Sequence, residues 1–497
     1  MDLGKGNPPD SDQAAAAPHL PFATPSENPA AASATGIEGL DFILHGGLPR
    51  SRPTLLRGGP GTGKTVFALT ILCHGLINGE PGVLVTFDEA PQALLHHGKV
   101  LGLDLSQYTA QGKVRILDMR PIRGDVVTGE TFELTAVLAR IRHALEQTGA
   151  QRLVIDGIDG MEEAFIGTGT GLRNELSRIF DWLRECGRTT LITAGERTDF
   201  SRQYGVEDYV ADCVIELKQE LNNRSMSRLL RVIKKRGGGH ESNEFPFLVD
   251  HEGIFVLPVT GTKLRSCAAT QRISTGISGL DRMLGGQGPY LGGTLMYSGQ
   301  SGTGKTTFAA HFAHAAFLRG ENVLYVSFEE GAAELVRNQS SIGLDLNGCP
   351  NPGGTHPGKL LLKPILAAEL GGEEHLLRVM RLVQRHQPSV VILDPVSALG
   401  NKLKEMNSKA LMLRLLHMLK NQGVTTVITE LLGDGSNEVS SLDISSMIDV
   451  WVKLIRRERE GRLHRLLSVV KARGMATADY VSEFTLSGNG VTIQGGR

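Results

Sequence analysis

The stretch GGPGTGKT at residues 58–65 returns in altered form as GQSGTGKT at residues 299–306. Both stretches satisfy the phosphate-loop pattern G-x-x-x-x-G-K-[ST], and each lies between an apolar strand pattern and a helical pattern. Glycines permit the positive φ values that let backbone N–H groups close around phosphate oxygens. One isolated match could be a glycine-rich turn, but two matches in the same context predict two ATP sites in the chain.

The sequence around the two loops is repeated as well. ATGIEGLDFILHGGLPR (34–50) returns as STGISGLDRMLGGQGPY (274–290), and RLVIDGIDGM (152–161) returns as VVILDPVSAL (390–399). A duplicated domain explains this better than chance similarity. The boundaries that we expect are a flexible tail rich in Ala, Pro and Ser over 1–33, a first domain over 34–258, a linker over 259–273 and a second domain over 274–497.

Each copy alternates short β-branched runs with longer amphipathic stretches. In the first copy, GVLVTF (82–87) and RLVIDG (152–157) are runs of the first kind, and TAVLARIRHALEQTG (135–149) is a stretch of the second. Nearly continuous apolar strands between helical patterns indicate a mostly parallel sheet with helices on both faces. We therefore predict an α/β protein made of two tandem P-loop NTPase domains, each a mostly parallel sheet flanked by helices.

Composition argues against several other classes of protein. The chain has 497 residues, and Lys+Arg 52 against Asp+Glu 53 gives a formal charge of −1, so no global positive field attracts nucleic acid or an anionic membrane. The five cysteines lie far apart without a CxxC pair or a Cys/His cluster, which argues against a disulfide scaffold or a structural zinc site. No apolar run has the length of a membrane span and no secretion signal is visible, so we expect a cytoplasmic protein.

The last two residues of each phosphate loop have different expected roles. Lys64 and Lys305 would reach the β- and γ-phosphates of ATP, and the hydroxyl groups of Thr65 and Thr306 would ligate Mg²⁺. Further nucleotide contacts are expected from Gly59, Gly61, Thr62 and Gly63 in the first loop and from Gly302, Thr303 and Gly304 in the second.

Acidic residues follow two apolar strand patterns in each copy. Asp156 and Asp394 end the runs RLVID and SVVILD, where a carboxylate could hold a magnesium-bound water, although strand-end aspartates also act as turn formers or helix caps.

The second acidic feature is a pair of neighbouring carboxylates. The pairs Asp88–Glu89 and Glu329–Glu330 stand at the same distance after their loop lysines and could polarise the nucleophile that attacks the γ-phosphate. A single pair could be a solvated acidic turn, but recurrence at the same offset favours the catalytic interpretation.

Basic residues recur near the end of each copy. Lys234 with Arg236, and Lys471 with Arg473, have the i, i+2 spacing that places two side chains on one face of a strand. Because RecA-type folds bind nucleotides at subunit interfaces, these residues are candidates for reaching the ATP of a neighbouring copy. The alternative is a solvated or nucleic-acid-facing basic edge. The first interpretation requires an oligomer.

Several of these features together resemble one family. The doubled TGI-GLD motif and the doubled phosphate loops occur with the strand-end acidic pairs and with the stretches YGVEDYVAD (204–212) and KKRGGGH (234–240). In this combination, from about residue 34 to about residue 490, the chain resembles the KaiC family of two-domain RecA-like ATPases of the cyanobacterial circadian clock. The resemblance implies a hexamer of two stacked rings with ATP between subunits, ATP hydrolysis in the first ring, and autokinase and autophosphatase activity in the second.

The resemblance also implies roles for individual residues. Asp88 and Glu329 correspond to the catalytic glutamate of the family, and because Asp88 is one methylene shorter, either Glu89 compensates or hydrolysis in the first ring is slower. Contacts to ATP from the neighbouring subunit are implied for Lys234, Lys235, Arg236, Gly238 and His240 and, in the second copy, for Arg465, Lys471, Ala472 and Arg473.

The stretch ISSMIDVWV (444–452) corresponds to the phosphoacceptor segment of the family. It offers Ser445 and Ser446 ahead of Asp449, although serines before a strand commonly form turns. A further acceptor threonine of the family has no counterpart here, because Leu442 stands near that point. The resemblance therefore predicts serine phosphorylation without the full set of family sites.

The resemblance also bears on partners. A KaiB-like protein is a possible partner, whereas the extended C-terminal tail with which clock members of the family engage an activator has no counterpart after VTIQGGR (491–497).

Two other functions compete with an autokinase. A RecA- or DnaB-like DNA-binding motor or recombination accessory would need a basic, aromatic-bearing groove, but aromatic residues make up 5% of the chain and there is no net positive charge. A non-catalytic ATP-gated scaffold would be expected to lack the acidic pairs, which are present.

Overall fold

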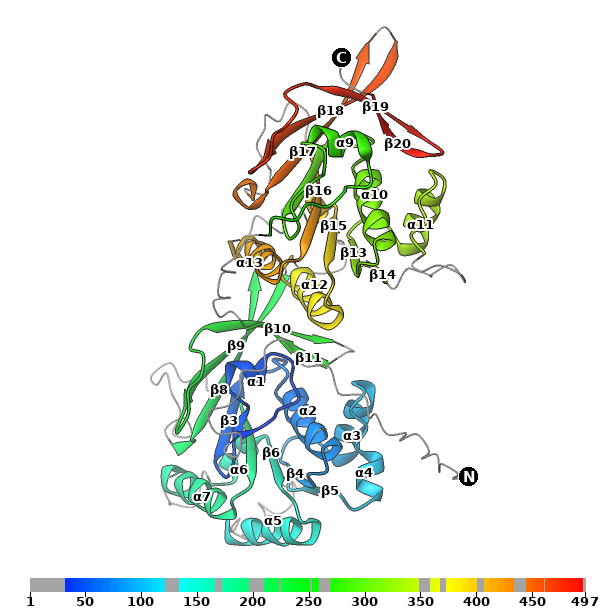
Figure 1. The fold of residues 1–497 in the computed structure, drawn as a ribbon. Coiled ribbons are helices and arrows are strands. Elements are labelled where there is room, and N and C mark those ends of the chain that lie inside the picture. Colours follow the sequence, from blue (N-terminus) through cyan, green and yellow to red (C-terminus); the bar gives the residue numbers. More distant parts are fainter. Residues whose placement is uncertain are drawn as a thin grey trace, which may run out of the picture.

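The computed structural model describes residues 32–120, 134–165, 172–195, 210–222, 225–250, 253–258, 269–347, 358–366, 372–399, 406–432, 444–459 and 461–494. Within these ranges the chain forms two nine-stranded sheets, one in each repeat, and helices lie on both faces of each sheet (Figure 1). The predicted α/β fold with two tandem RecA-like P-loop domains is confirmed. Most of the expected tail and linker, residues 204–209 and Leu442 lie outside the described residues.

The first sheet has a parallel part and an antiparallel part. Strands β3, β7, β6, β4 and β5 are parallel neighbours, β8 joins β3 in parallel, and β9, β10 and β11 follow as antiparallel strands. Their bounds are β3 Pro53–Gly58, β4 Gly82–Thr86, β5 Val114–Asp118, β6 Arg152–Asp156, β7 Thr189–Ala194, β8 Cys213–Asn222, β9 Ser225–Lys235, β10 Glu244–Asp250 and β11 Gly253–Val256. A small antiparallel pair, β1 Ala32–Ser33 and β2 Leu48–Pro49, precedes the sheet.

The second sheet repeats this arrangement strand for strand. Its order β14-β13-β15-β16-β12-β17-β18-β19-β20 matches the order β5-β4-β6-β7-β3-β8-β9-β10-β11 of the first. The bounds are β12 Thr294–Gly299, β13 Val323–Ser327, β14 Leu360–Pro364, β15 Val390–Asp394, β16 Thr425–Leu431, β17 Val450–Arg459, β18 Arg462–Ala472, β19 Ser482–Ser487 and β20 Gly490–Ile493. The sequence repeat is therefore a repeat of topology.

Among the described residues, each α-helix of the second domain has a counterpart in the first, which has two more, α4 and α6. In the first domain they are α1 Leu40–Ile43, α2 Lys64–Ile77, α3 Pro91–Val100, α4 Ser106–Ala110, α5 Leu134–Thr148, α6 Ile158–Phe165 and α7 Leu172–Cys186. In the second they are α9 Ser278–Met283, α10 Lys305–Leu318, α11 Ala332–Ser340, α12 Gly372–His386 and α13 Met406–Gln422, with the short 3-10 helix η4 at Ser445–Met447. Among the described residues, no helix is both long and apolar enough to cross a membrane.

The helix after each phosphate loop is locked to the antiparallel part of the sheet by an aromatic pair. Phe67 of α2 meets Phe247 of β10 edge to face at 5.5 Å between ring centroids, and Phe308 of α10 meets Phe484 of β19 in the same way at 5.2 Å. Edge-to-face pairs are worth about 0.5–1.5 kcal/mol beyond the burial of the rings. Equivalent core contacts therefore hold each phosphate loop at the same position relative to its own sheet.

The two domains share an apolar contact. Leu248 of β10, Phe255 of β11 and Leu257 are buried in one cluster with residues of α12 in the second domain, and Figure 1 shows α12 above β10. The outer strands of the first sheet thus form the platform on which the second domain rests.

A buried arginine crosses the same boundary. The side chain of Arg381 on α12 is only 4% exposed; its Nε lies 3.1 Å from Oε2 of Glu38 and its Nη1 lies 2.9 Å from Oδ1 of Asp250. Arg385, one turn further along α12, also contacts Glu38 at 2.9 Å. Removing one partner of a buried ion pair typically costs about 3–5 kcal/mol, so this contact fixes how the domains meet.

Candidate nucleotide and phosphoacceptor sites

Both phosphate loops have the same backbone conformation. Gly61 and Gly63 have φ values of 74° and 100°, and the matching Gly302 and Gly304 have 71° and 100°. Residues with a Cβ rarely adopt these angles, so the loop shape requires glycine at these positions. The helix that follows each loop begins at the loop lysine, so its free N–H groups would point at a phosphate bound in the loop.

The loop lysines fold back over their own loops. Nζ of Lys64 donates to the carbonyl oxygens of Gly58 and Gly59 at 2.7 and 3.0 Å. Nζ of Lys305 donates to the carbonyls of Gly299 and Gln300 at 3.0 and 2.8 Å. Thr62 and Thr303 close each loop by donating to a carbonyl three residues earlier, at 2.9 and 2.8 Å.

A strand-end carboxylate faces the threonine of each loop. Oγ1 of Thr65 donates to Oδ2 of Asp156 at 3.1 Å, and Oγ1 of Thr306 donates to Oδ1 of Asp394 at 3.3 Å. Burial raises the pKa of both carboxyl groups, and the hydroxyl donors around them act in the opposite direction. Hydroxyl and carboxylate oxygens are the ligands that Mg²⁺ prefers, so the donor set of both sites fits this ion.

The two strand-end carboxylates differ in their surroundings. Asp156 accepts a hydrogen bond from Thr193 at 2.6 Å. Asp394 accepts the equivalent bond from Thr429 and a second one from the fully buried Tyr325, whose hydroxyl lies 2.6 Å from Oδ2. The extra donor was missed in the sequence, where a tyrosine within the apolar run NVLYVSF (322–328) was the only signal for it.

The first residue of each acidic pair lies close to the nucleotide loop. A Cβ at Gly157, the residue after Asp156, would stand 2.3 Å from the carboxyl group of Asp88. Burial and then the negative charge of Asp156 raise the pKa of Asp88. Burial and then the charge of Asp394 likewise raise the pKa of Glu329, and Lys305 opposes this shift. A base with a raised pKa is suited to proton transfer near neutral pH.

The second residue of each pair contacts the next helix instead. Oε2 of Glu89 lies 3.1 Å from Nδ1 of His97 on α3. Oε2 of Glu330 accepts a hydrogen bond from Nδ2 of Asn338 on α11 at 3.2 Å. The backbone N–H of each also bonds to the hydroxyl of the last residue of the preceding strand. The structure thus distinguishes the two members of a pair that the sequence treats alike.

Lys234 with Arg236, and Lys471 with Arg473, lie at the C-terminal ends of β9 and β18, at the end of the sheet away from the phosphate loops. Arg465 lies further back on β18, opposite Arg456 of β17. Arg236 contacts Asp212 at 3.8 Å, and Arg473 contacts Asp449 at the same distance. In both copies the aspartate opens the strand beside the phosphate-loop strand, and its N–H bonds to that strand's first residue, Pro53 in one case and Thr294 in the other.

The remaining residues of the two basic segments also have local partners. Lys235 donates to the carbonyl of Leu44, and Nδ1 of His240 lies 3.0 Å from the carbonyl of Glu241. Lys471 donates to the carbonyl of Ser445 at 2.8 Å. Lys234 is at the C-terminal end of β9, Ala472 is at the end of β18, and Gly238 lies next to Lys235.

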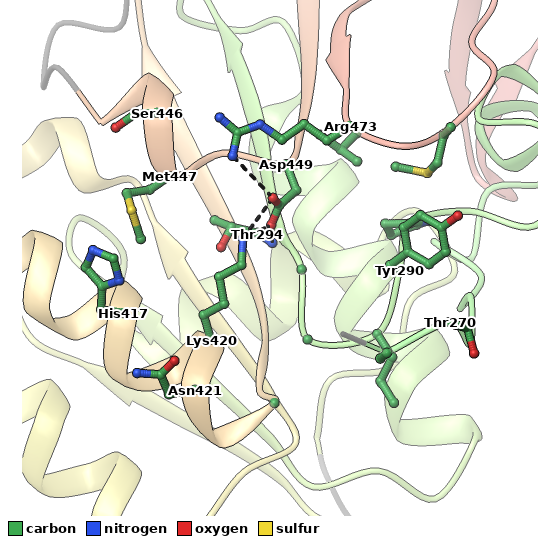
Figure 2. Close-up of a pocket in the computed structure, with 18 residues that line it drawn as sticks. Thr270, Tyr290, Thr294, His417, Lys420, Asn421, Ser446, Met447, Asp449 and Arg473 are labelled. Atoms are coloured by element: carbon green, nitrogen blue, oxygen red, sulfur yellow. Dashed lines mark hydrogen bonds and ion pairs between the residues drawn. The ribbon is translucent and has the colours of Figure 1, made fainter. Parts of the chain in front are cut away.

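Ser445 and Ser446 are exposed and begin the 3-10 helix η4. Ser446 and Asp449 line a cavity of about 730 Å³ together with Lys420 and Arg473. Figure 2 shows Lys420 and Arg473 reaching Asp449 from two sides, with Nζ of Lys420 at 2.8 Å. Ser446 therefore stands at a cavity whose lining includes Lys420, Arg473 and Asp449, and Ser445 precedes it in η4.

Each domain combines a phosphate loop with a strand-end carboxylate and with a second carboxylate nearby, and both domains have the same strand order. These features define the class of this protein. It is a tandem P-loop ATPase of the RecA-like type, and each of its domains binds ATP.

Comparison with known proteins identifies the family within this class. The model described as "ATPase: KaiC" matches residues 33–261 and again residues 273–496. The chain is 38% identical over 465 residues to the circadian clock protein KaiC2 of Synechocystis sp., covering 92% of this chain and 80% of that protein. It is 32% identical over 468 residues to the circadian clock oscillator protein KaiC of Parathermosynechococcus lividus (93% and 85% covered) and to that of Synechococcus elongatus (93% and 88%). The chain belongs to the KaiC family.

Proposed function

We propose that the second domain is a serine autokinase that phosphorylates Ser445, Ser446 or both with ATP held by another copy of the chain. The first domain hydrolyses ATP, and copies assemble as a homohexamer with a nucleotide at each subunit interface. The nearly full-length similarity to KaiC proteins supports this division of labour.

The position of the serines supports transfer between copies. Thr294, at the first residue of β12, lines the same cavity as Ser446, whereas the phosphate loop begins at Gly299, the last residue of that strand. Six strand residues at about 3.3 Å each span about 17 Å, and reacting atoms must come within about 3–3.5 Å. The serines are therefore out of reach of their own phosphate loop, and a second copy has to supply the ATP.

The residues at the rim of the cavity fit this arrangement. Lys471 and Arg473 are anchored there by the Ser445 carbonyl and by Asp449, so their positive charges lie beside the acceptor serines. Cations at this point would hold the phosphates of an ATP that a neighbouring copy brings to the serines.

The transfer step is an in-line displacement. The serine Oγ attacks the γ-phosphorus while the bond from this phosphorus to the β,γ-bridging oxygen breaks, and ADP leaves with the electron pair. Glu329 of the copy that holds the ATP accepts the serine proton. In the first domain Asp88 accepts a proton from water in the same way. Mg²⁺ held by Thr65 with Asp156, and by Thr306 with Asp394, would neutralise the charge of the phosphates.

Two defective variants test transfer between copies. Lys305→Ala removes the donor site but keeps the acceptor serines, and Ser445→Ala with Ser446→Ala does the reverse. Each variant alone should stay unlabelled with labelled ATP, whereas a mixture assembled in the presence of ATP should carry phosphate on the serines of the Lys305→Ala chain, identified by a mass tag. A mixture without label on that chain would contradict the proposal. Release of phosphate stimulated by single-stranded DNA, with no label retained on protein, would favour the DNA motor instead.

Relatives that carry clock names support a proposal for the cellular role. We propose a timing or signalling role in the cytoplasm, with a KaiB-like protein as a possible partner. Co-purification of a small partner that depends on the nucleotide state would support this role, and loss of the protein without any change in rhythmic or stress-dependent output would count against it.

A further inference from the structure

A β-hairpin covers the phosphate loop in each domain. In the second domain it consists of β17 and β18, in which Leu454 stands opposite Leu467 and Arg456 stands opposite Arg465. Residues directly opposite in an antiparallel pair share a face of the sheet. Leu454 and Leu467 are buried in the same core as Phe308 of α10, so this face of the hairpin is the one that covers the phosphate-loop helix.

The same face continues past the leucines to the phosphate loop itself. A Cβ at Gly302 would lie 3.3 Å from Nη1 of Arg456, which places this guanidinium against the loop of its own domain. In the first domain the equivalent hairpin residue is Gln219, whose Oε1 would lie 3.6 Å from a Cβ at Gly61. The position is shared, but one side chain is a cation and the other is a neutral amide.

Among the described residues, no carboxylate neutralises the positive charges of Arg456 and Arg465. Arg456 and Arg465 face each other directly, and like charges at such positions repel. Nε of Arg465 is buried and has no hydrogen-bond partner among the residues that the structure describes. Across the described part of the chain, neither arginine forms an ion pair with a carboxylate. Two adjacent guanidinium groups beside a phosphate-binding loop leave an anion as the partner that would satisfy both.

We infer that Arg456 is a phosphate-binding residue of the second nucleotide site, supplied by the same chain that supplies the loop. With it, the second site binds nucleoside triphosphate more tightly than the first, where Gln219 takes its place. A guanidinium offers paired donors to phosphate oxygens, and its effect grows with the number of phosphates. The inference rests on ATP binding by the phosphate loops and does not depend on serine phosphorylation.

Exchange of the two hairpin residues tests the inference in full-length protein. Lys64→Ala isolates the second site and Lys305→Ala isolates the first, and the dissociation constants of ATP, ADP and AMP are then measured at low and high salt. In the isolated second site, Arg456→Gln should weaken ATP binding by about tenfold, ADP less and AMP least. In the isolated first site, Gln219→Arg should strengthen ATP binding in the same order. Both changes should shrink at high salt.

A neighbouring arginine provides the matched control. Arg457 lies opposite His464 on the other face of the same hairpin, so Arg457→Gln removes the same charge without facing the loop, and its effect should stay within about twofold. Arg456→Lys should retain part of the affinity, because lysine keeps the positive charge but lacks the paired N–H donors of the guanidinium group.

Two results would overturn the inference: equal losses from Arg456→Gln and Arg457→Gln, or no loss from Arg456→Gln. If instead Lys305→Ala failed to reduce ATP binding in otherwise unchanged protein, the phosphate-loop assignment would fall first. The thermal midpoints of the variants show whether any loss comes from unfolding.

Discussion

The two nucleotide sites of this chain share a backbone and differ in the side chains around it. The phosphate loops have φ values that agree within a few degrees, and in each the last residue, a threonine, donates a hydrogen bond to a strand-end aspartate. Within the loops, Gly59 and Pro60 stand where the second domain has Gln300 and Ser301. Beside the loops, Asp88 is matched by Glu329, Leu84 by Tyr325 and Gln219 by Arg456. The two copies therefore share the loop conformation and differ in the side chains that surround it.

The acceptor segment is a further difference between the copies. When the chain is aligned on the equivalent residues Asp212 and Asp449, Asp208 and Tyr209 stand where the second domain has Ser445 and Ser446. The first domain therefore lacks the paired serines, which is consistent with water as its proposed acceptor.

The largest expected effect separates the members of the acidic pair in the second domain. Glu329→Gln should lower serine phosphorylation about a thousandfold, because it removes the proposed proton acceptor. Glu330→Gln should have only a small effect, since that side chain bonds to Asn338 instead. Quantitative mass spectrometry of residues 440–449 after incubation with ATP measures both. Equal losses of phosphorylation in the two variants would show that Glu329 and Glu330 do not have different roles.

A smaller effect is expected for the matching residue of the first domain. In a Lys305→Ala background, Asp88→Asn should lower phosphate release about a hundredfold, and Asp88→Glu should raise it if the shorter side chain limits the reach to water. Steady-state phosphate release is the measurement. Unchanged release in Asp88→Asn would remove Asp88 from the mechanism and turn attention to Glu89.

The third prediction concerns the donor that only the second domain has. Tyr325→Phe should reduce the free energy of unfolding of the second domain by about 1.5–3 kcal/mol, because Asp394 loses a buried hydrogen bond. Tyr297→Phe is the control, since Tyr297 is equally buried and its hydroxyl has no hydrogen-bond partner within the described ranges. Denaturant unfolding followed by Trp451 fluorescence, with Trp182→Phe to silence the first domain, compares them. Similar losses of unfolding free energy in both variants would mean that the hydrogen bond from Tyr325 to Asp394 does not stabilise the domain.

The smallest effect is a pH dependence common to both sites. Because burial and a neighbouring aspartate raise the pKa of Asp88 and Glu329, each gains its proton at a higher pH than an ordinary carboxyl group. Activity should therefore decline on the acid side above the usual carboxyl range of about 4. Single-turnover rates of the Lys305→Ala and Lys64→Ala proteins across pH test this, and flat profiles down to about pH 4 would contradict it.

Some features of this molecule were predictable from the sequence and others were not. The loops, strand-end aspartates and parallel sheets were predicted, because glycine patterns and apolar runs act locally and recur in both copies. The contacts of Tyr325 and Arg456 were not, since they depend on which strands become neighbours and on the register of a hairpin. The different surroundings of Glu329 and Glu330 arise from the direction of two adjacent side chains, which spacing alone does not reveal.

The contact of Arg381 with Glu38 and Asp250 gives the chain a mechanical continuity that the sequence repeat conceals. Helix α12 ends at His386, β15 begins at Val390, and β15 ends at Asp394 beside the second phosphate loop. A displacement of β10 in the first domain must therefore either break a buried ion pair or push on the strand that carries Asp394. The two domains are therefore mechanically coupled through α12. Cutting the chain between them would break this contact, so we do not expect either half to work as an independent enzyme.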